Sequence, residues 1–152
     1  MKIEIKMGTN SYLEVTDAAG RAFFMRNIQG PVVMLNLLRF RAMADYSTSP
    51  ELAPDAPISG EQAFQRYIDH TMPFLTASAG NIRFLGKGGS WLIGPDDEAW
   101  DMAMLIEQES VASFIGWNSH EDYLKGIGHR TAALLDSRLL PLVETTGAIQ
   151  QD

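Results

Sequence analysis

A run of apolar residues at positions 31–40, PVVMLNLLRF, constrains the fold of this chain more than any other segment. Successive side chains of a β-strand point to opposite faces, so a strand with one face in water alternates apolar and polar residues. Here both parities are apolar: Val32, Met34, Leu38 and Phe40 on one, and Val33, Leu35 and Leu37 on the other. The run therefore predicts a strand that is covered on both faces.

Two polar side chains interrupt this run, the amide of Asn36 and the guanidinium of Arg39. Both groups are costly to bury without a hydrogen-bonding partner, and they lie on opposite faces of a regular strand. Asn36 is expected to bond to neighbouring backbone or, if its face meets a partner, to project into the space between subunits. Arg39 is expected to contact a ligand or to pair with an acid such as Asp101.

The segments after this strand predict a helix and then a hairpin. Ser59 and Gln62 fit a capping box at the start of an amphipathic helix, in which Pro73 predicts a kink or an early end. Residues 81–94, NIRFLGKGGSWLIG, predict a strand with a glycine-rich break or bulge, and residues 100–109, WDMAMLIEQE, its antiparallel partner.

The last third of the chain predicts a second helical region and a final strand. Ser110 caps a helix over 111–118, and a second helix starts at Ser119, with glycines that interrupt it. The closing segment RLLPLVET contains Pro141, which cannot donate to a ladder and so predicts a sheet edge or a bulge.

Two further segments accompany these elements. A leader of about residues 1–30 contains a short helix that Thr16 or Asp17 caps and that ends near Asn27. A loop of about residues 41–59, with three prolines, is longer than most loops of compact domains and is expected to be a lid or a mobile excursion.

The order strand, helix, strand, strand, helix, strand predicts an α+β fold, the ferredoxin-like antiparallel sheet with helices on one face. We expect a single domain over residues 1–152. The helices cover only one face of the sheet, whereas the first strand is apolar on both. A second copy of the chain is the economical cover for the other face, so we predict a homodimer.

Composition excludes several classes of function. The chain has no cysteine, which rules out disulfides and thiolate metal sites. A net charge of -7 opposes binding to nucleic acid. No apolar run approaches the roughly 20 residues that span a bilayer, and the start, MKIEIKMGTN, lacks the pattern of a secretory signal, so a cytoplasmic location is expected. The histidines lack the HExxH spacing, and we expect neither a metal nor a cofactor.

The chain resembles the family known as domain of unknown function 1330, within the dimeric α/β barrel superfamily. PVVMLNLLRF, YIDHTMPFL, GKGGSWLIG, WDMAMLIEQES and HEDYLKGIGHRTAALLDSRLLPLVE carry the resemblance, which covers about residues 30–145. It implies a ferredoxin-like subunit whose sheet faces that of a second subunit. It implies no activity.

Tyr67 and His70 are the predicted catalytic pair. They share a stripe with Phe74 beside the apolar face of the first long helix, and a histidine can act as a general base near neutral pH. The alternative is that His70 is solvated or bonded to backbone.

Three more residues complete the predicted site. Trp91 either lines an apolar pocket or packs in a core or interface. Asp101 either contacts a ligand or pairs with Arg39, Arg83 or Arg130. Arg130, next to His129, either recognises a carboxylate or ties the last helix to an acid.

Three hypotheses about function follow. The first is a homodimer that binds a small, mainly apolar organic molecule with a carbonyl or carboxylate between sheet and helices. The second is a cofactor-independent enzyme of the isomerase or monooxygenase kind, with His70 as general base and Asn36 or Arg130 stabilising an oxyanion. The third is a non-catalytic assembly module.

Overall fold

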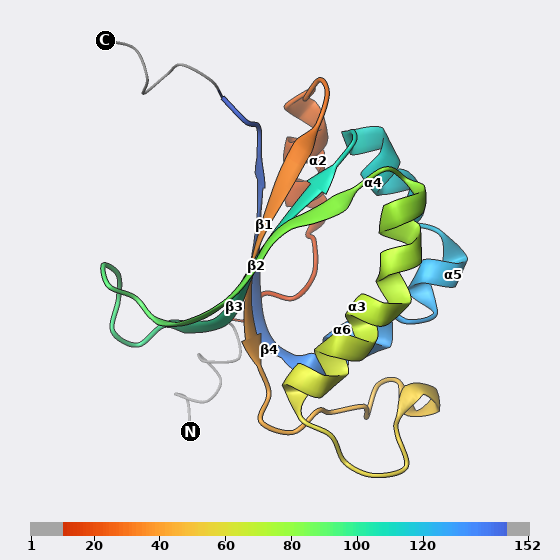
Figure 1. The fold of residues 1–152 in the computed structure, drawn as a ribbon, viewed down its shortest axis with the longest axis vertical. Helices are drawn as coiled ribbons and strands as arrows, with labels where there is room; N and C mark the ends of the chain where they lie inside the picture. Colours follow the sequence, from red (N-terminus) through yellow and green to blue (C-terminus); the bar gives the residue numbers. More distant parts are fainter. Residues whose placement is uncertain (1–10, 146–152) are drawn as a thin grey trace.

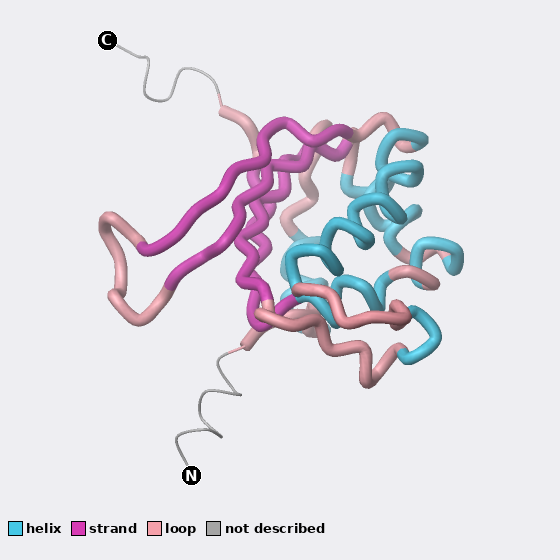
Figure 2. Tube along the Cα trace, turned by 60° about the horizontal axis from the view of Figure 1, so that its bottom comes forward, coloured by secondary structure: helices cyan, strands magenta, loops and turns pink. Residues whose placement is uncertain are grey.

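The computed structural model describes residues 11–145; residues 1–10, the start of the predicted leader, and 146–152 lie outside the described part. Within it, four strands form one sheet, and helices cover one face of that sheet (Figures 1 and 2). The strands are β1 (Val32–Phe40), β2 (Asn81–Ser90), β3 (Ala99–Gln108) and β4 (Leu134–Leu142). The helices are α2 (Asp17–Met25), the 3-10 helix η1 (Pro50–Leu52), α3 (Gly60–Ala77), α4 (Val111–Asn118), α5 (Glu121–Leu124) and α6 (Ile127–Ala133). None of the helices in residues 11–145 is long and apolar enough to cross a membrane.

The strand order is β2-β3-β1-β4, and every neighbouring pair is antiparallel. β1 is therefore central and β4 is an edge, as the two-faced apolar run and Pro141 predict. With one helical connection between β1 and β2 and another between β3 and β4, the architecture is the ferredoxin-like fold. The fold-class prediction is confirmed.

The core lies between β1 and the helices. The face of β1 that carries Val32, Met34 and Leu38 is turned inward, and these side chains are at most 2% exposed. Leu38 belongs to the buried cluster with Phe64 of α3, whose ring centroid lies 5.6 Å from that of Phe40. The even-numbered side of β1 is thus the helix side of the sheet.

Helix α3 begins where the capping box predicts. The Ser59 hydroxyl accepts from the Gln62 amide at 3.0 Å, and the Gln62 side chain accepts from the Ser59 amide at 2.9 Å. The prediction of an early end at Pro73 is wrong, because the helix continues to Ala77. Pro73 and Asp69, whose carbonyl loses its helical partner, are both exposed, so water can solvate that carbonyl.

The β2–β3 hairpin differs from the prediction in the position of its bulge. The register shifts between Ile82 and Phe84, whereas the glycines at 86 and 89 pair regularly with Ala103 and Trp100. The glycine-rich stretch does not break the strand. At Gly86 an added Cβ would lie 2.7 Å from the Phe84 ring, so this glycine makes room for an aromatic side chain.

The second helical region consists of three short helices. Ser110 caps α4, as predicted, and its hydroxyl accepts from the Ser113 amide at 3.0 Å. The next helix starts one residue later than predicted, because His120 and not Ser119 is its N-cap. The predicted interruption by glycine occurs at Gly126, which separates α5 from α6.

The leader helix α2 is capped by Thr16, as predicted, and ends at Met25. Hydrogen bonds fasten the segment before it to the last part of the chain. The Ser137 hydroxyl donates to the Tyr12 carbonyl at 2.6 Å, and the Arg130 guanidinium donates to the Leu13 carbonyl at 2.7 Å. The leader thus lies beside the edge strand β4.

The loop 41–59 is anchored at its base. The Ala44 amide donates to the Ile58 carbonyl and the Asp45 amide to the Ala132 carbonyl, each at 2.9 Å. The first bond joins the two limbs of the loop, and the second fastens the loop to α6. The loop therefore has a defined shape of its own.

Candidate functional site

His70, one of the predicted catalytic pair, connects α3 to α5. Its Nε2 lies 2.9 Å from the Asp122 carbonyl and 3.1 Å from the Tyr123 carbonyl, and its ring packs against Gly126, where an added Cβ would clash with it. Since carbonyls only accept, Nε2 carries the proton, and Nδ1 keeps a lone pair in the neutral ring. The alternative prediction, that His70 bonds to backbone, describes its contacts.

Tyr67, the other member of the pair, contacts a different partner. Its hydroxyl lies 2.6 Å from the hydroxyl of Tyr123, which is 2% exposed. Burial, followed by the neighbouring Tyr67, raises the pKa of Tyr123 far above its usual range, so this phenol stays protonated. Trp117 packs edge-on against Tyr123 with centroids 5.1 Å apart. Tyr67 is part of a packed aromatic cluster between α3 and α5.

Asn36 lies on the helix side of the sheet. It shares its face with Met34 and Leu38, and its side-chain amide donates to the Met34 carbonyl at 3.2 Å. The expectation that its amide projects into the space between subunits is therefore wrong. The parity of Asn36 was correctly assigned, but the pattern could not show which face meets the helices.

Arg39 and Asp101 do not form the expected ion pair. Asp101 accepts a hydrogen bond from the Phe40 amide at 2.7 Å, while Arg39 is exposed on the outer face of β1. The alternative partners are also engaged elsewhere, because Arg83 pairs with Glu107 and Glu144, and Arg130 bonds to Leu13 and Ser137. The Asp101 carboxylate thus provides a hydrogen-bond acceptor for the last backbone amide of β1.

Trp91 lies far from the helices, in the turn of the β2–β3 hairpin, which projects away from the helix layer (Figures 1 and 2). It is 39% exposed and packs over Gly94, while the adjacent Leu92 and Ile93 are 99% and 91% exposed. The predicted ligand-binding residues therefore occupy separate places and do not form one site. Within residues 11–145, no three His, Asp or Glu side chains gather closely enough to hold a metal ion.

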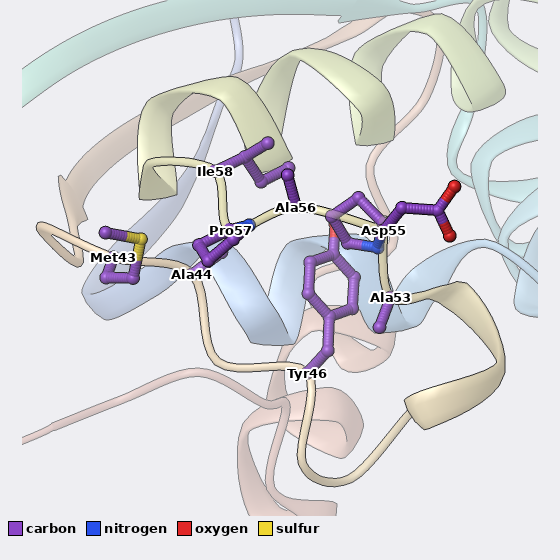
Figure 3. A pocket seen from close by; sticks show the side chains of 9 residues that line it. Met43, Ala44, Tyr46, Ala53, Asp55, Ala56, Pro57 and Ile58 are labelled. Carbon is purple, nitrogen blue, oxygen red and sulfur yellow. The ribbon is translucent and has the colours of Figure 1, made fainter.

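A hollow of about 340 Å³, wide open to solvent, is lined entirely by residues of the loop 41–59, and we call it the cavity beneath the loop. Most of its lining is apolar and comes from both limbs of the loop (Figure 3): Met43, Ala44, Tyr46, Ala53, Pro54, Asp55, Ala56, Pro57 and Ile58. Tyr46 is 9% exposed and reaches from one limb toward the other, and Asp55 stands at the rim with its carboxylate turned away from the Tyr46 ring (Figure 3). A mostly apolar lining with few polar groups is a feature that this hollow shares with small-molecule sites.

Tyr46 also forms the shortest contact between the loop and α6. Its hydroxyl lies 2.7 Å from Nδ1 of His129, and the two rings meet edge-on. Burial, followed by the charges of Arg66 and His70, lowers the pKa of His129, while burial raises the pKa of Tyr46. The pair is therefore a neutral imidazole and a protonated phenol at neutral pH. Sequence reasoning missed it because no spacing connects residues 83 positions apart.

A larger hollow of about 390 Å³ lies on the surface at the start of α3. Its lining is polar: Ser59, Glu61, Gln62 and Gln65. Three of these side chains are already engaged, Ser59 and Gln62 in the capping box and Gln65 with Asp69 at 2.9 Å. We regard the cavity beneath the loop as the better candidate, because its lining is mostly apolar and includes the buried side chain of Tyr46.

The outer face of the sheet carries a continuous apolar row. Pairing across the four strands places one residue of each strand side by side: Phe84, Leu105, Leu35 and Leu140. The outermost two, Phe84 and Leu140, are 56% and 52% exposed. The helices lie on the opposite face (Figure 2), so this row is uncovered in the single chain.

The fold defines the class of protein, a ferredoxin-like α+β protein, and its candidate site is a small hollow formed by the loop 41–59. Comparison with solved structures identifies the family. The crystal structure of RPA0582, a protein of unknown function from Rhodopseudomonas palustris, is 30% identical, covers 91% of this chain and 100% of its own, and has a TM-score of 0.80. Its methylated form gives the same identity and TM-score and is covered over 98% of its length. This chain belongs to the family of that protein.

More distant solved structures also match the chain. A dimeric ferredoxin-like protein of unknown function from Thermobifida fusca is 11% identical, with 76% of this chain and 92% of that chain covered and a TM-score of 0.43. The chain matches no protein-family model and no curated protein. The resemblance to the domain of unknown function 1330 therefore stays a prediction.

Proposed function

We propose that this protein is a homodimer that binds a small, mainly apolar organic molecule in the cavity beneath the loop 41–59. The observation that carries the ligand part is the cavity itself. Its volume of about 340 Å³ falls within the range of roughly 300–1,000 Å³ of small-molecule sites. This location replaces the space between sheet and helices, because buried core side chains such as Leu38 and Phe64 pack in that space.

The anchoring of the loop supports this proposal. The hydrogen bonds from Ala44 to Ile58 and from Asp45 to Ala132 hold both limbs of the loop in place. A loop that is held by bonds within the protein loses less entropy when a ligand binds to it. The contact of the Tyr46 hydroxyl with His129 fixes the position of the Tyr46 side chain in the lining.

The apolar outer row supports the homodimer. Exposed apolar surface that is continuous across four strands favours burial against a partner, and an antiparallel sheet with helices on one face buries its other face most simply against a copy of itself. In a two-fold arrangement the row formed by Phe84, Leu105, Leu35 and Leu140 would meet the same row of the second subunit.

A second candidate is a cofactor-independent proton-transfer enzyme with His70 as its base. The observation that favours it is the fixed orientation of the ring, since the Asp122 and Tyr123 carbonyls hold the proton on Nε2 and leave Nδ1 as an acceptor. His70→Ala would then abolish turnover while leaving ligand binding in place. The packing of His70 against Gly126 supports a structural role equally well.

Native mass spectrometry of gently purified protein tests the first proposal. We expect a dimer that carries a small additional mass, which disappears on denaturation. Ala56→Trp, which fills the cavity, should release that mass, whereas Ala112→Trp, at an exposed position of α4, should retain it. A bare dimer would contradict the ligand and point to an assembly module, and a monomer would contradict the homodimer.

A further inference from the structure

The end of the β2–β3 hairpin extends beyond the rest of the sheet, and we call residues 88–100 the hairpin arm. β1 pairs with β3 only as far as Met102, whereas β2 and β3 continue to pair with each other up to Ser90 and Ala99. In both views the hairpin leaves the sheet on the side opposite the helices (Figures 1 and 2). The hairpin arm therefore projects from the outer face, which carries the apolar row.

Contacts at both ends give the hairpin arm a defined shape. At its base Trp100 is 4% exposed, its indole nitrogen donates to the Glu98 carboxylate at 2.9 Å, and the guanidinium of Arg138 lies 4.9 Å from its ring centroid. In the turn, the Trp91 ring packs over Gly94, where an added Cβ would clash with it. The turn thus holds its other side chains in a set direction.

Two of these other side chains form an exposed apolar tip. Leu92 is 99% exposed and Ile93 is 91% exposed, and no other large apolar side chain of residues 11–145 exceeds 72%. The neighbouring Trp91, at 39%, adds part of its ring to the same turn. Contiguous apolar surface of this kind marks an interaction site.

The charges beside the tip restrict its partner. Asp96, Asp97 and Glu98 follow the tip in the sequence, and the chain carries a net charge of -7. A negative charge is repelled by the anionic lipids of a membrane surface and by the phosphates of a nucleic acid. The outer face of a second copy offers the opposite charge, because Arg39 is exposed there, next to apolar side chains such as Leu35.

We infer that the hairpin arm of each subunit packs through Leu92 and Ile93 against the sheet side of the partner subunit. This inference rests on the proposed homodimer. When the outer rows of two subunits meet, an arm that projects from the same face extends toward the other subunit. Two-fold symmetry makes the contact twice, once with each arm.

Photo-crosslinking of the full-length protein tests this contact. The photoreactive residue p-benzoyl-phenylalanine is incorporated in place of Leu92, and the purified protein is irradiated as a mixture of ¹⁵N-labelled and unlabelled chains. We expect a covalent dimer that joins one labelled and one unlabelled chain, with the cross-link in strand residues of the partner. The same photoreactive residue in place of Leu124, which is 46% exposed on α5, is the matched control and should give no covalent dimer.

A double variant measures what the contact contributes. Leu92→Ser combined with Ile93→Ser should raise the dissociation constant of the dimer at least about tenfold, because each dimer loses two buried aliphatic pairs. Sedimentation velocity measures this constant. Both residues lie in an exposed turn, so circular dichroism should show an unchanged fold. Equal dimer affinity of the double variant and wild type would overturn the inference.

The remaining outcomes separate this inference from the proposal beneath it. A dimer by sedimentation that gives no cross-link from position 92, or cross-links only between two hairpin turns, overturns the arm contact and leaves the homodimer standing. A monomer by sedimentation means that the homodimer and the inference both fail. Co-flotation of the wild-type protein, but not of the double variant, with vesicles of phosphatidylcholine and phosphatidylglycerol would overturn the choice of partner and assign the tip to a membrane.

Discussion

Replacing Leu140 by serine tests whether the apolar outer row is a dimer interface. Leu140 lies on the edge strand β4, opposite Leu35, and is 52% exposed in the single chain. Full burial of a leucine side chain contributes about 1.5–3 kcal/mol, so burial of the exposed half contributes about 0.8–1.5 kcal/mol. A two-fold interface contains the residue twice, which makes the expected loss about 1.5–3 kcal/mol per dimer.

Each 1.4 kcal/mol is a factor of ten in affinity, so the dissociation constant of the dimer should rise about 10-fold to 150-fold. Sedimentation velocity over a dilution series measures this constant, and circular dichroism verifies that the variant is folded. Leu124→Ser is the matched control, because Leu124 is 46% exposed on α5, away from the sheet. Equal dimer affinity of Leu140→Ser and wild type, or an equal loss in Leu124→Ser, would refute the assignment of this face.

Three further predictions concern stability, measured by urea unfolding. Gly126→Ala should lower the free energy of unfolding by about 1–3 kcal/mol, because the new methyl group displaces the His70 ring and its hydrogen bonds. The control is Gly116→Ala, which adds a methyl group in open space on α4 and should leave the free energy of unfolding unchanged or raise it. A rise in stability for Gly126→Ala would show that the His70 contact is unimportant. Ser59→Ala should cost about 1 kcal/mol through loss of the helix cap, and no change would contradict the role of the capping box. Burial holds the pKa of His129 below its ordinary value of 6.5, so the unfolded chain takes up this proton first. Stability should therefore decrease as the pH falls below about 6.5, and His129→Gln should reduce that slope; an identical slope in the variant would refute the assignment.

The fold could be predicted from the sequence because its signals are local. The period of the apolar run, the capping residues Ser59 and Ser110 and the position of Pro141 each depend on a few neighbouring residues. Together they are compatible with few topologies. The bulge at Ile82 was not predictable in this way, because register depends on both strands and on the turn that joins them.

The candidate site could not be predicted, because it depends on contacts between distant segments. Tyr46 sits in a loop without periodicity, and its partner His129 comes from a helix near the end of the chain. His70 was correctly placed on the helix of Tyr67, yet helical spacing does not show that its ring packs on Gly126. Whether the Asn36 side chain faces the helices depends on which face of the sheet the helices cover. The apolar pattern of a strand does not show this.

The central position of β1 has a consequence for the order in which the protein can fold during synthesis. β1 is the first strand to be made, but its two neighbours are β3 and β4, and β4 ends only at Leu142. Until then, one edge of the most apolar strand has no pairing partner, and such an edge readily pairs with other chains. A nascent chain that stalls before residue 134 would thus expose an unpaired strand edge that can pair with other chains. This protein should therefore depend on chaperones more before its release from the ribosome than after it.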